Sequence, residues 1–220
     1  MQIQTLHSII SFLIQTAMHV EYIDGENIPT SGGCIIATNH LSRLDIPILF
    51  ISPGRTHVTA LAADKYKHYP FFRWILDVAK VIWIDRENAD FGAMRASVEY
   101  LKQGVALGIA PEGTRSKGSL IEGKAGTALI AEKAGVPIVP VGIAGTESAM
   151  RKLVHLQRAN VSVRYGPAFY IPPMDRNDRE GWLKNSTDEI MCRIAALLPP
   201  IYRGIYSGHP RLAEILATEQ

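Results

Sequence analysis

Residues 107–141 read LGIAPEGTRSKGSLIEGKAGTALIAEKAGVPIVPV, and this stretch decides the fold class. Residues 107–110 and 136–141 are short apolar runs of strand length, whereas residues 126–134 between them have the length and composition of a helix. Strands that alternate with helices are typical of a largely parallel sheet, because each helix carries the chain back to begin the next strand in the same direction.

The same alternation continues on both sides of this stretch. It predicts strands at residues 34–37, 58–63, 81–84 and 161–165, helices at residues 64–79, 91–104 and 188–198, and a further apolar stretch at residues 46–51. No repeat, low-complexity linker or shift in composition divides the chain. We therefore expect a single α/β domain at residues 21–200 with a largely parallel, helix-covered sheet, preceded by an amphipathic helix at residues 1–20 and followed by a tail at residues 201–220.

The composition is that of a globular protein. Hydrophobic residues make up 47% and charged residues 20% of the 220 residues, which excludes a disordered, collagenous or coiled-coil chain. The 23 basic and 21 acidic side chains leave a formal charge of +2, too balanced to predict a nucleic-acid partner. Cys34 and Cys192 match no paired metal-ligand spacing, so we expect two reduced core cysteines in a cytosolic protein and no metal site.

The first twenty residues contain no charged side chain, and the first charge is that of Glu21. Polar residues interrupt the segment too often for a membrane span, and it lacks the basic start and cleavage site of a signal peptide. The polar stripe consists of Gln4, Ser8, Ser11, Gln15 and His19, and the broad apolar face consists of Ile3, Leu6, Ile9, Ile10, Leu13, Ile14 and Val20. Such a helix either packs on the core or lies in a membrane interface.

Residues 39–45, NHLSRLD, combine a histidine with a carboxylate five residues later, directly after a predicted strand. Asp45 can hold one ring nitrogen of His40 and leave the other to accept a proton from a hydroxyl, as in the His-Asp half of a catalytic triad. The alternative is that Asp45 caps a helix and His40 is a loop residue. Ser42 would complete a triad, but no G-x-S-x-G elbow presents it as a nucleophile, so we expect it to cap a helix or to support the pair.

Two further polar segments follow predicted strands. Residues 111–116, PEGTRS, supply a carboxylate, a glycine that exposes backbone N–H groups and an arginine able to bind phosphate through two hydrogen bonds. Asp85 and Arg86 follow the strand at residues 81–84, and Arg86 adds a second guanidinium that can bind phosphate. The alternative role of Arg86 is a surface ion pair with a neighbouring acidic residue. Lys117 and Lys124 flank the first of these loops and could add to phosphate binding, although exposed lysines are usually solvated.

Four blocks of this chain, taken together, resemble the glycerophospholipid acyltransferase family, typified by lysophosphatidate acyltransferase. They are N-H-x-S-x-x-D at residues 39–45, Ile-Asp-Arg at residues 84–86, P-E-G-T-R-S at residues 111–116 and Val-Pro-Ile-Val-Pro-Val at residues 136–141, which with their flanks cover about residues 22–170. The chain departs from the family pattern at Lys80, where the second block usually opens with Gly, and at Ala110, where Phe commonly precedes the third. The resemblance implies a glycerolipid acyltransferase-like α/β fold.

The resemblance also implies transfer of a fatty acyl group from a thioester to the free hydroxyl of lysophosphatidate, giving phosphatidate in phospholipid biosynthesis. His40 would act as general base, oriented by Asp45, and the acceptor alkoxide would attack the thioester without a covalent enzyme intermediate. A backbone N–H in the loop around Gly113 would stabilise the oxyanion. The implied substrate-binding residues are Arg86 and Arg115 for the acceptor phosphate, Glu112 for the glycerol or an arginine, and Gly113 and Thr114 of the same block. No cofactor or metal is implied, and either acyl-CoA or acyl carrier protein would serve as the thioester co-substrate.

The expected partners are a membrane surface and a lysophospholipid, because the acceptor and the acyl chain both reside in or near lipid. Residues 65–75, KYKHYPFFRWI, interleave basic and aromatic side chains; with the uncharged first helix they predict a peripheral (monotopic) protein on the cytoplasmic face of the membrane. Glycerol-3-phosphate or another lysophospholipid stays open as acceptor. Two other classes also stay open: a lysolipid or thioester hydrolase, which needs no arginines for a phosphate, and a non-catalytic lipid-binding module, which needs neither His40 nor Asp45.

Overall fold

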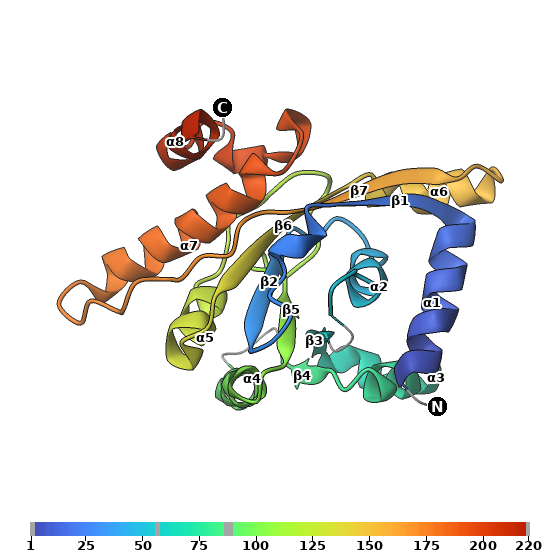
Figure 1. Ribbon diagram of the computed structural model, residues 1–220, viewed down its shortest axis with the longest axis horizontal. Coiled ribbons are helices and arrows are strands. Elements are labelled where there is room, and N and C mark those ends of the chain that lie inside the picture. The colour runs from blue at the N-terminus through green and yellow to red at the C-terminus, as the bar shows by residue number, and fades with distance from the viewer. Residues whose placement is uncertain (1–2, 56–57, 86–89, 219–220) are drawn as a thin grey trace.

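The computed structural model describes residues 3–55, 58–85 and 90–218. Within these residues the chain forms a seven-stranded sheet in the order β1-β7-β6-β2-β5-β3-β4 (Figure 1). The strands are β1 (Met18–Ile23), β2 (Cys34–Thr38), β3 (Val58–Ala63), β4 (Ile82–Ile84), β5 (Ala106–Ile109), β6 (Ile138–Ala144) and β7 (Ala159–Tyr165). Neighbouring strands are parallel except for β6 and β7, which run antiparallel. The predicted α/β fold with a largely parallel sheet is therefore confirmed.

Helices cover both faces of the sheet because its central strands are apolar on both faces (Figure 1). Along β2, Ile35 and Ala37 belong to one hydrophobic cluster, whereas Cys34 and Ile36 belong to another. The helices that contribute to the first cluster are α4 (Phe91–Lys102), α5 (Gly126–Ala134), α7 (Arg179–Ala196) and α8 (Pro210–Thr218), and those that contribute to the second are α1 (Ile3–Ala17), α2 (Asp45–Phe50) and α6 (Ala149–Val154).

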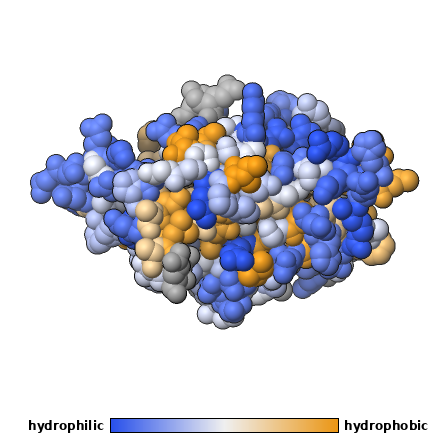
Figure 2. Space-filling view, turned by 90° about the horizontal axis from the view of Figure 1, so that it is seen from above, coloured by the Kyte–Doolittle hydropathy of each residue, from blue (hydrophilic) through white to orange (hydrophobic). Residues whose placement is uncertain are grey.

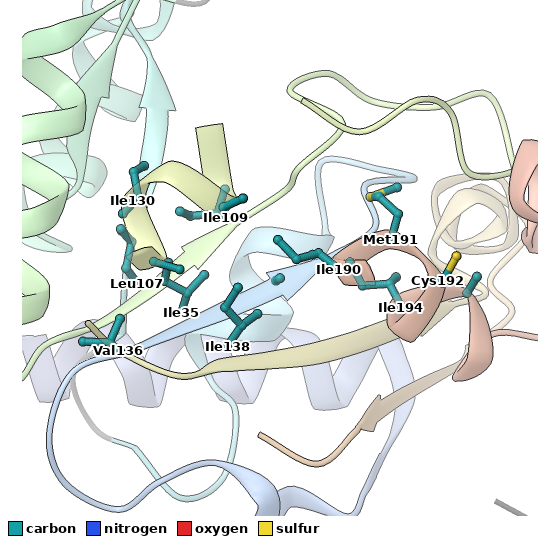
Figure 3. Close-up of a cluster of buried hydrophobic side chains, with 14 of the residues drawn as sticks. Ile35, Leu107, Ile109, Ile130, Val136, Ile138, Ile190, Met191, Cys192 and Ile194 are labelled. Carbon is teal, nitrogen blue, oxygen red and sulfur yellow. The ribbon is translucent and has the colours of Figure 1, made fainter. Parts of the chain in front are cut away.

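The first cluster joins the sheet to its covering helices. Figure 3 shows Ile35 and Ile138 of the sheet beside Ile130 of α5 and Ile190 of α7. Cys192 lies in this cluster and Cys34 in the second, and both thiols are buried and unpaired.

The central strands bring the motifs to one edge of the sheet. β2 lies between β5 and β6 and is parallel to both, with Ala37 in register with Ile109 and Pro140. Because parallel neighbours end at the same edge, the segments that follow these three strands lie close together. The blocks at residues 39–45 and 111–116 both begin there.

Two predicted helices have different bounds in the structure. Residues 64–79 form a 3₁₀ helix, η2 (Asp64–His68), and then α3 (Pro70–Val78). Pro70 at the first position of α3 disfavours a helical conformation at Tyr69, which is extended at φ −107° and ψ 102°. α7 begins at Arg179 instead of residue 188, because the Asp178 side chain accepts a hydrogen bond from the Gly181 amide and caps it.

The first twenty residues divide between a helix and a strand. α1 ends at Ala17, and the chain enters β1 at Met18 as an edge strand parallel to β7. Leu6 and Ile14 are buried, so core packing is confirmed for that face of α1. Three large apolar side chains of α1 stay exposed, namely Ile9, Phe12 and Leu13. No helix of the described residues is both long and apolar enough to cross a membrane.

Residues 201–218, predicted as a tail, pack on the domain. Two 3₁₀ helices, η4 (Pro200–Tyr202) and η5 (Gly204–Tyr206), precede α8, which packs against α7. The Leu120 amide donates to the Tyr202 carbonyl, and the Gly123 amide donates to the Tyr206 hydroxyl. The C-terminal segment thereby holds the loop that follows residues 111–116.

Candidate active site

The chain leaves β2 in a turn that is tied to β6. The Asn39 side chain forms two hydrogen bonds of 2.8 Å with the backbone of Ile143: Nδ2 donates to the carbonyl, and Oδ1 accepts from the amide. Asn39 is buried, so these bonds satisfy polar atoms that would otherwise be costly to remove from water. They fix the position of the next residue, His40.

His40 and Asp45 are in direct contact. His40 Nδ1 lies 2.8 Å from Oδ2 of Asp45, the first residue of α2, whose side chain is fully buried. The same oxygen accepts hydrogen bonds from the amides of Leu41 and Ser42, both at 2.8 Å, so Asp45 turns back to the preceding loop and does not cap α2. Because a carboxylate only accepts, Nδ1 carries the proton and Nε2 is left as the acceptor. Nε2 has no hydrogen-bond partner within the described part of the chain.

Ser42 supports this loop. Its hydroxyl oxygen accepts the Leu44 amide at 3.0 Å and lies 3.4 Å from Asp45 Oδ1. No hydrogen bond joins it to His40 in the described residues. A nucleophile activated by the histidine would need that bond, so the geometry agrees with the expected supporting role.

Thr146, which sequence analysis missed, is a further partner of Asp45. Its buried hydroxyl donates to Asp45 Oδ1 at 2.6 Å from η3 (Thr146–Ser148), which follows β6. The signal that could have found it is a hydroxyl residue two positions beyond a central parallel strand, at the edge where the other site residues lie.

The block at residues 111–116 binds the backbone of His40 on both sides. Glu112 Oε1 accepts the His40 amide at 2.8 Å, and the Ser116 amide donates to the His40 carbonyl at 2.8 Å. The other oxygen of Glu112 accepts the Ile121 amide at 3.1 Å. Glu112 is 1% exposed, and each of its carboxylate oxygens accepts a backbone amide. The role toward glycerol or an arginine that the resemblance implied for Glu112 stays a prediction. Burial raises the pKa of the Glu112 carboxyl, an effect that the two amide hydrogen bonds oppose.

Gly113, Thr114 and Arg115 form the turn between Glu112 and Ser116. Gly113 has a φ of 68°, and its N–H donates to the Ala110 carbonyl at 3.0 Å, so this amide is used within the turn. Thr114 and Arg115 are exposed, and among the described residues their amides donate no hydrogen bond. These two amides are therefore the better candidates for oxyanion donors.

The two remaining predicted cations are placed differently. Arg86 lies outside the described residues, although Asp85 before it lines a cavity beside His40. Lys124, expected to be solvated, lines the same cavity, and its chain crosses Gly113 so closely that a Cβ there would lie 3.1 Å from the lysine Cδ. A third positive charge is thus available beside the turn.

The cavity has a volume of about 280 Å³ and is lined in part by His40. Its apolar wall comes from α2, α4, α5 and the strands β3, β4 and β5. The apolar side chains that line it include Ile46, Leu49, Leu61, Ile84, Met94, Ile109 and Ile130. An apolar space next to one histidine nitrogen can hold a hydrocarbon chain while its reactive end faces that nitrogen.

Residues 19–144 match the family model described as Acyltransferase. The chain belongs to this family. The part of this acyltransferase that matches contains β1 to β6 and, with them, the His40–Asp45 pair and the block at residues 111–116.

Several relatives of this acyltransferase have descriptions that name a substrate. The chain is 35% identical, over 159 residues, to a probable 1-acyl-sn-glycerol-3-phosphate acyltransferase of Mycoplasma pneumoniae; the match covers 68% of this chain and 58% of that protein, less than two thirds of its length. It is 26% identical, over 176 residues, to the 1-acyl-sn-glycerol-3-phosphate acyltransferase of Borreliella burgdorferi, covering 78% and 70% of the two chains. The crystal structure of the 1-acyl-sn-glycerophosphate acyltransferase PlsC from Thermotoga maritima superposes with a TM-score of 0.65 at 22% identity, covering 84% of this chain and 76% of that one.

Thr146→Val tests the hydrogen bond to Asp45. Without the donor, Asp45 Oδ1 loses its 2.6 Å hydrogen bond, and the carboxylate holds the His40 ring less firmly. We expect kcat to fall about tenfold or more with little change in KM, since a hydrogen bond to a charged group contributes about 1.5 to 3 kcal/mol. Thr146→Ser should keep both near the wild-type values. Thr187→Val, at a buried hydroxyl that donates within α7, is the matched control; an unchanged kcat in Thr146→Val would contradict the assignment.

Proposed function

We propose that this chain transfers a fatty acyl group from a thioester to the free hydroxyl of lysophosphatidate, forming phosphatidate in phospholipid biosynthesis. The observation that carries the proposal is the buried His40–Asp45 pair, with His40 lining a largely apolar cavity. The substrate class comes from the descriptions of the relatives, which act on 1-acyl-sn-glycerol-3-phosphate.

His40 is the proposed general base. Its Nε2 takes the proton of the acceptor hydroxyl, and the resulting alkoxide attacks the thioester carbonyl. The tetrahedral intermediate then collapses to the ester and the thiolate, which recovers the proton from the imidazolium. Asp45 stabilises the imidazolium and holds the ring in one tautomer throughout. No acyl-enzyme forms in this scheme, in keeping with the position of Ser42.

The oxyanion and the acceptor phosphate are assigned to the loop at residues 113–115. The exposed amides of Thr114 and Arg115 would stabilise the tetrahedral oxyanion, as such donors do in other acyl-transfer sites. The Arg115 guanidinium would bind the acceptor phosphate, with Arg86 and Lys124 as further cations. The acyl chain would occupy the apolar cavity, and its thioester would come from acyl-CoA or acyl carrier protein without any cofactor or metal.

We further propose that the protein binds the cytoplasmic face of a membrane through α1. Ile9, Phe12 and Leu13 are exposed on a helix that has no charged residue, and α3 packs beside it with Trp74 half exposed. Apolar side chains on one face and an aromatic residue nearby suit the interfacial layer of a bilayer. Thioester donors are cytosolic, which places this contact on the cytoplasmic leaflet.

A product assay with purified protein tests the reaction. His40→Ala should lower kcat by a factor on the order of 10² to 10⁴, because proton abstraction loses its base. Asp45→Asn should have a comparable effect, whereas Ser42→Ala should cost less than about tenfold. Phosphatidate formed from lysophosphatidate and a thioester is the expected product. Release of free fatty acid in its place would favour the hydrolase, and an acyl group attached to Ser42 in mass spectra would contradict direct attack.

Arg115→Ala tests the acceptor site. The substitution removes a charge-assisted contact to phosphate, worth about 1.5 to 3 kcal/mol, so the KM for lysophosphatidate should rise tenfold or more with little change in the KM for the donor. Lys117→Ala, an exposed cation two residues away, is the control and should leave both constants unchanged. Equal turnover of lysophosphatidate and uncharged monoacylglycerol by the wild type would contradict the phosphate assignment.

The membrane contact of α1 is tested by Ile9→Gln, Phe12→Gln and Leu13→Gln in one chain. Because these side chains are exposed, the thermal midpoint should change little while flotation with liposomes is lost. Ile201→Gln, at an exposed apolar residue of η4, should float like the wild type. Deletion of residues 1–20 is not a suitable test, since it removes the first half of β1 and the buried side chains of Leu6 and Ile14. Flotation of the triple variant at the wild-type level would refute the contact.

A further inference from the structure

The turn between α6 and β7 presents two large apolar side chains to solvent. Val154 is 79% exposed and Leu156 is 96% exposed. In Figure 1 this turn is the right-hand extremity of the molecule, and Figure 2, viewed from above, shows hydrophobic atoms projecting at the same end. The turn is convex, so these side chains form a tip instead of the wall of a groove.

The fold does not account for a leucine at position 156. The Gln157 amide donates to the Lys152 carbonyl and the Leu156 amide to the Leu153 carbonyl, which is the Schellman pattern of a helix end. The residue in the left-handed position of this motif is usually Gly or Asn, and here it is Leu156 with a φ of 56°. A large side chain is thus kept where the backbone disfavours it and where it packs against nothing in the core.

Basic residues flank the tip along the chain, without acidic neighbours in the sequence. Residues 148–174 contain no Asp or Glu, and Arg151 and Lys152 on α6 form no ion pair within the described residues. The whole chain carries a formal charge of only +2, so this basic segment is a local feature. Cations beside protruding apolar side chains complement an anionic lipid surface, in which the apolar groups reach the acyl region and the cations meet the headgroups.

The turn is also joined to α1. Nη2 of Arg158 donates to the carbonyl of Gln15 and, at 3.0 Å, to the carbonyl of Met18. These carbonyls lie at the C-terminal end of α1, where a cation is favourable. α1 and the turn therefore lie at the same end of the molecule (Figure 1).

We propose that the turn at residues 151–158 inserts into an anionic leaflet, with Val154 and Leu156 in the apolar layer and Arg151 and Lys152 among acidic headgroups. This inference rests on the proposed membrane attachment and is independent of the proposed reaction. An acidic protein would need a pocket to receive a convex tip, whereas a fluid lipid layer receives it without one, which favours lipid as the partner.

A fluorescent label at Leu156→Cys tests insertion directly. Cys34 and Cys192 are buried, so an environment-sensitive maleimide will react at the new cysteine. We expect a blue shift and quenching by brominated lipid with vesicles that contain phosphatidylglycerol, and no response with phosphatidylcholine alone. Tyr170→Cys, at an exposed residue of the β7–α7 connection, is the matched control and should not respond. A label at position 156 that stays accessible to aqueous iodide on bound protein, or that responds to acyl carrier protein and not to vesicles, would overturn the proposal.

Substitutions test the contribution of the tip to affinity. Leu156→Asn with Val154→Ser should weaken binding to anionic vesicles about tenfold and leave the thermal midpoint unchanged or higher, because Asn tolerates positive φ. Arg151→Gln with Lys152→Gln should weaken it about 25-fold at low salt, about fivefold for each cation. Wild-type affinity in both variants would refute the proposal. In both variants, acyl transfer to a short-chain, water-soluble acceptor should stay at the wild-type rate. A loss of this rate with unchanged vesicle binding would show an effect on the active site and would contradict a role of the turn in membrane binding.

Discussion

A carboxylate that is buried away from water must have its oxygens hydrogen-bonded, and the site depends on two such groups. Asp45 accepts from the amides of Leu41 and Ser42, from the Thr146 hydroxyl and from the ring of His40. Glu112 accepts from the amides of His40 and Ile121. The donors come from the segments that follow β2, β5 and β6, so satisfying the two carboxylates draws three strand ends together.

His40 is held by this arrangement at each group except one. Its amide donates to Glu112, its carbonyl accepts from Ser116, and Nδ1 contacts Asp45, which leaves Nε2 as the ring atom without a hydrogen-bond partner in the described residues. A base fixed in this way needs little rearrangement when charge develops on it, and such preorganisation is the main source of electrostatic stabilisation in catalysis. This placement of His40 is established when the sheet folds, because its hydrogen-bond partners are backbone groups and buried side chains.

The architecture and the motifs could be predicted from the sequence, whereas the roles of some motif residues could not. Apolar strand runs separated by helices predicted the parallel sheet, and the spacing of His40 and Asp45 predicted their contact, since both signals are local. The contact of Thr146 with Asp45 could not be predicted, because the two residues are 101 positions apart and one threonine in a loop has no distinguishing pattern. The burial of Glu112 and its two backbone amide partners were not predicted, because residue type does not reveal burial. The break at Pro70 was readable from the chain, whereas edge strand β1 was obscured by its continuity with an uncharged helix.

α1 shows how one element can combine a structural and an interfacial role. Leu6 and Ile14 are buried, Ile14 in a cluster with residues of the sheet, while Ile9, Phe12 and Leu13 are exposed, and no residue of the helix is charged. A flexible anchor would attach the domain to lipid without orienting it. Here α1 passes into β1 without a loop, and Arg158 binds the carbonyls at the junction. If α1 contacts the membrane as proposed, its orientation on the bilayer fixes the orientation of the sheet. The orientation of the sheet in turn fixes the position of His40, which follows the end of β2.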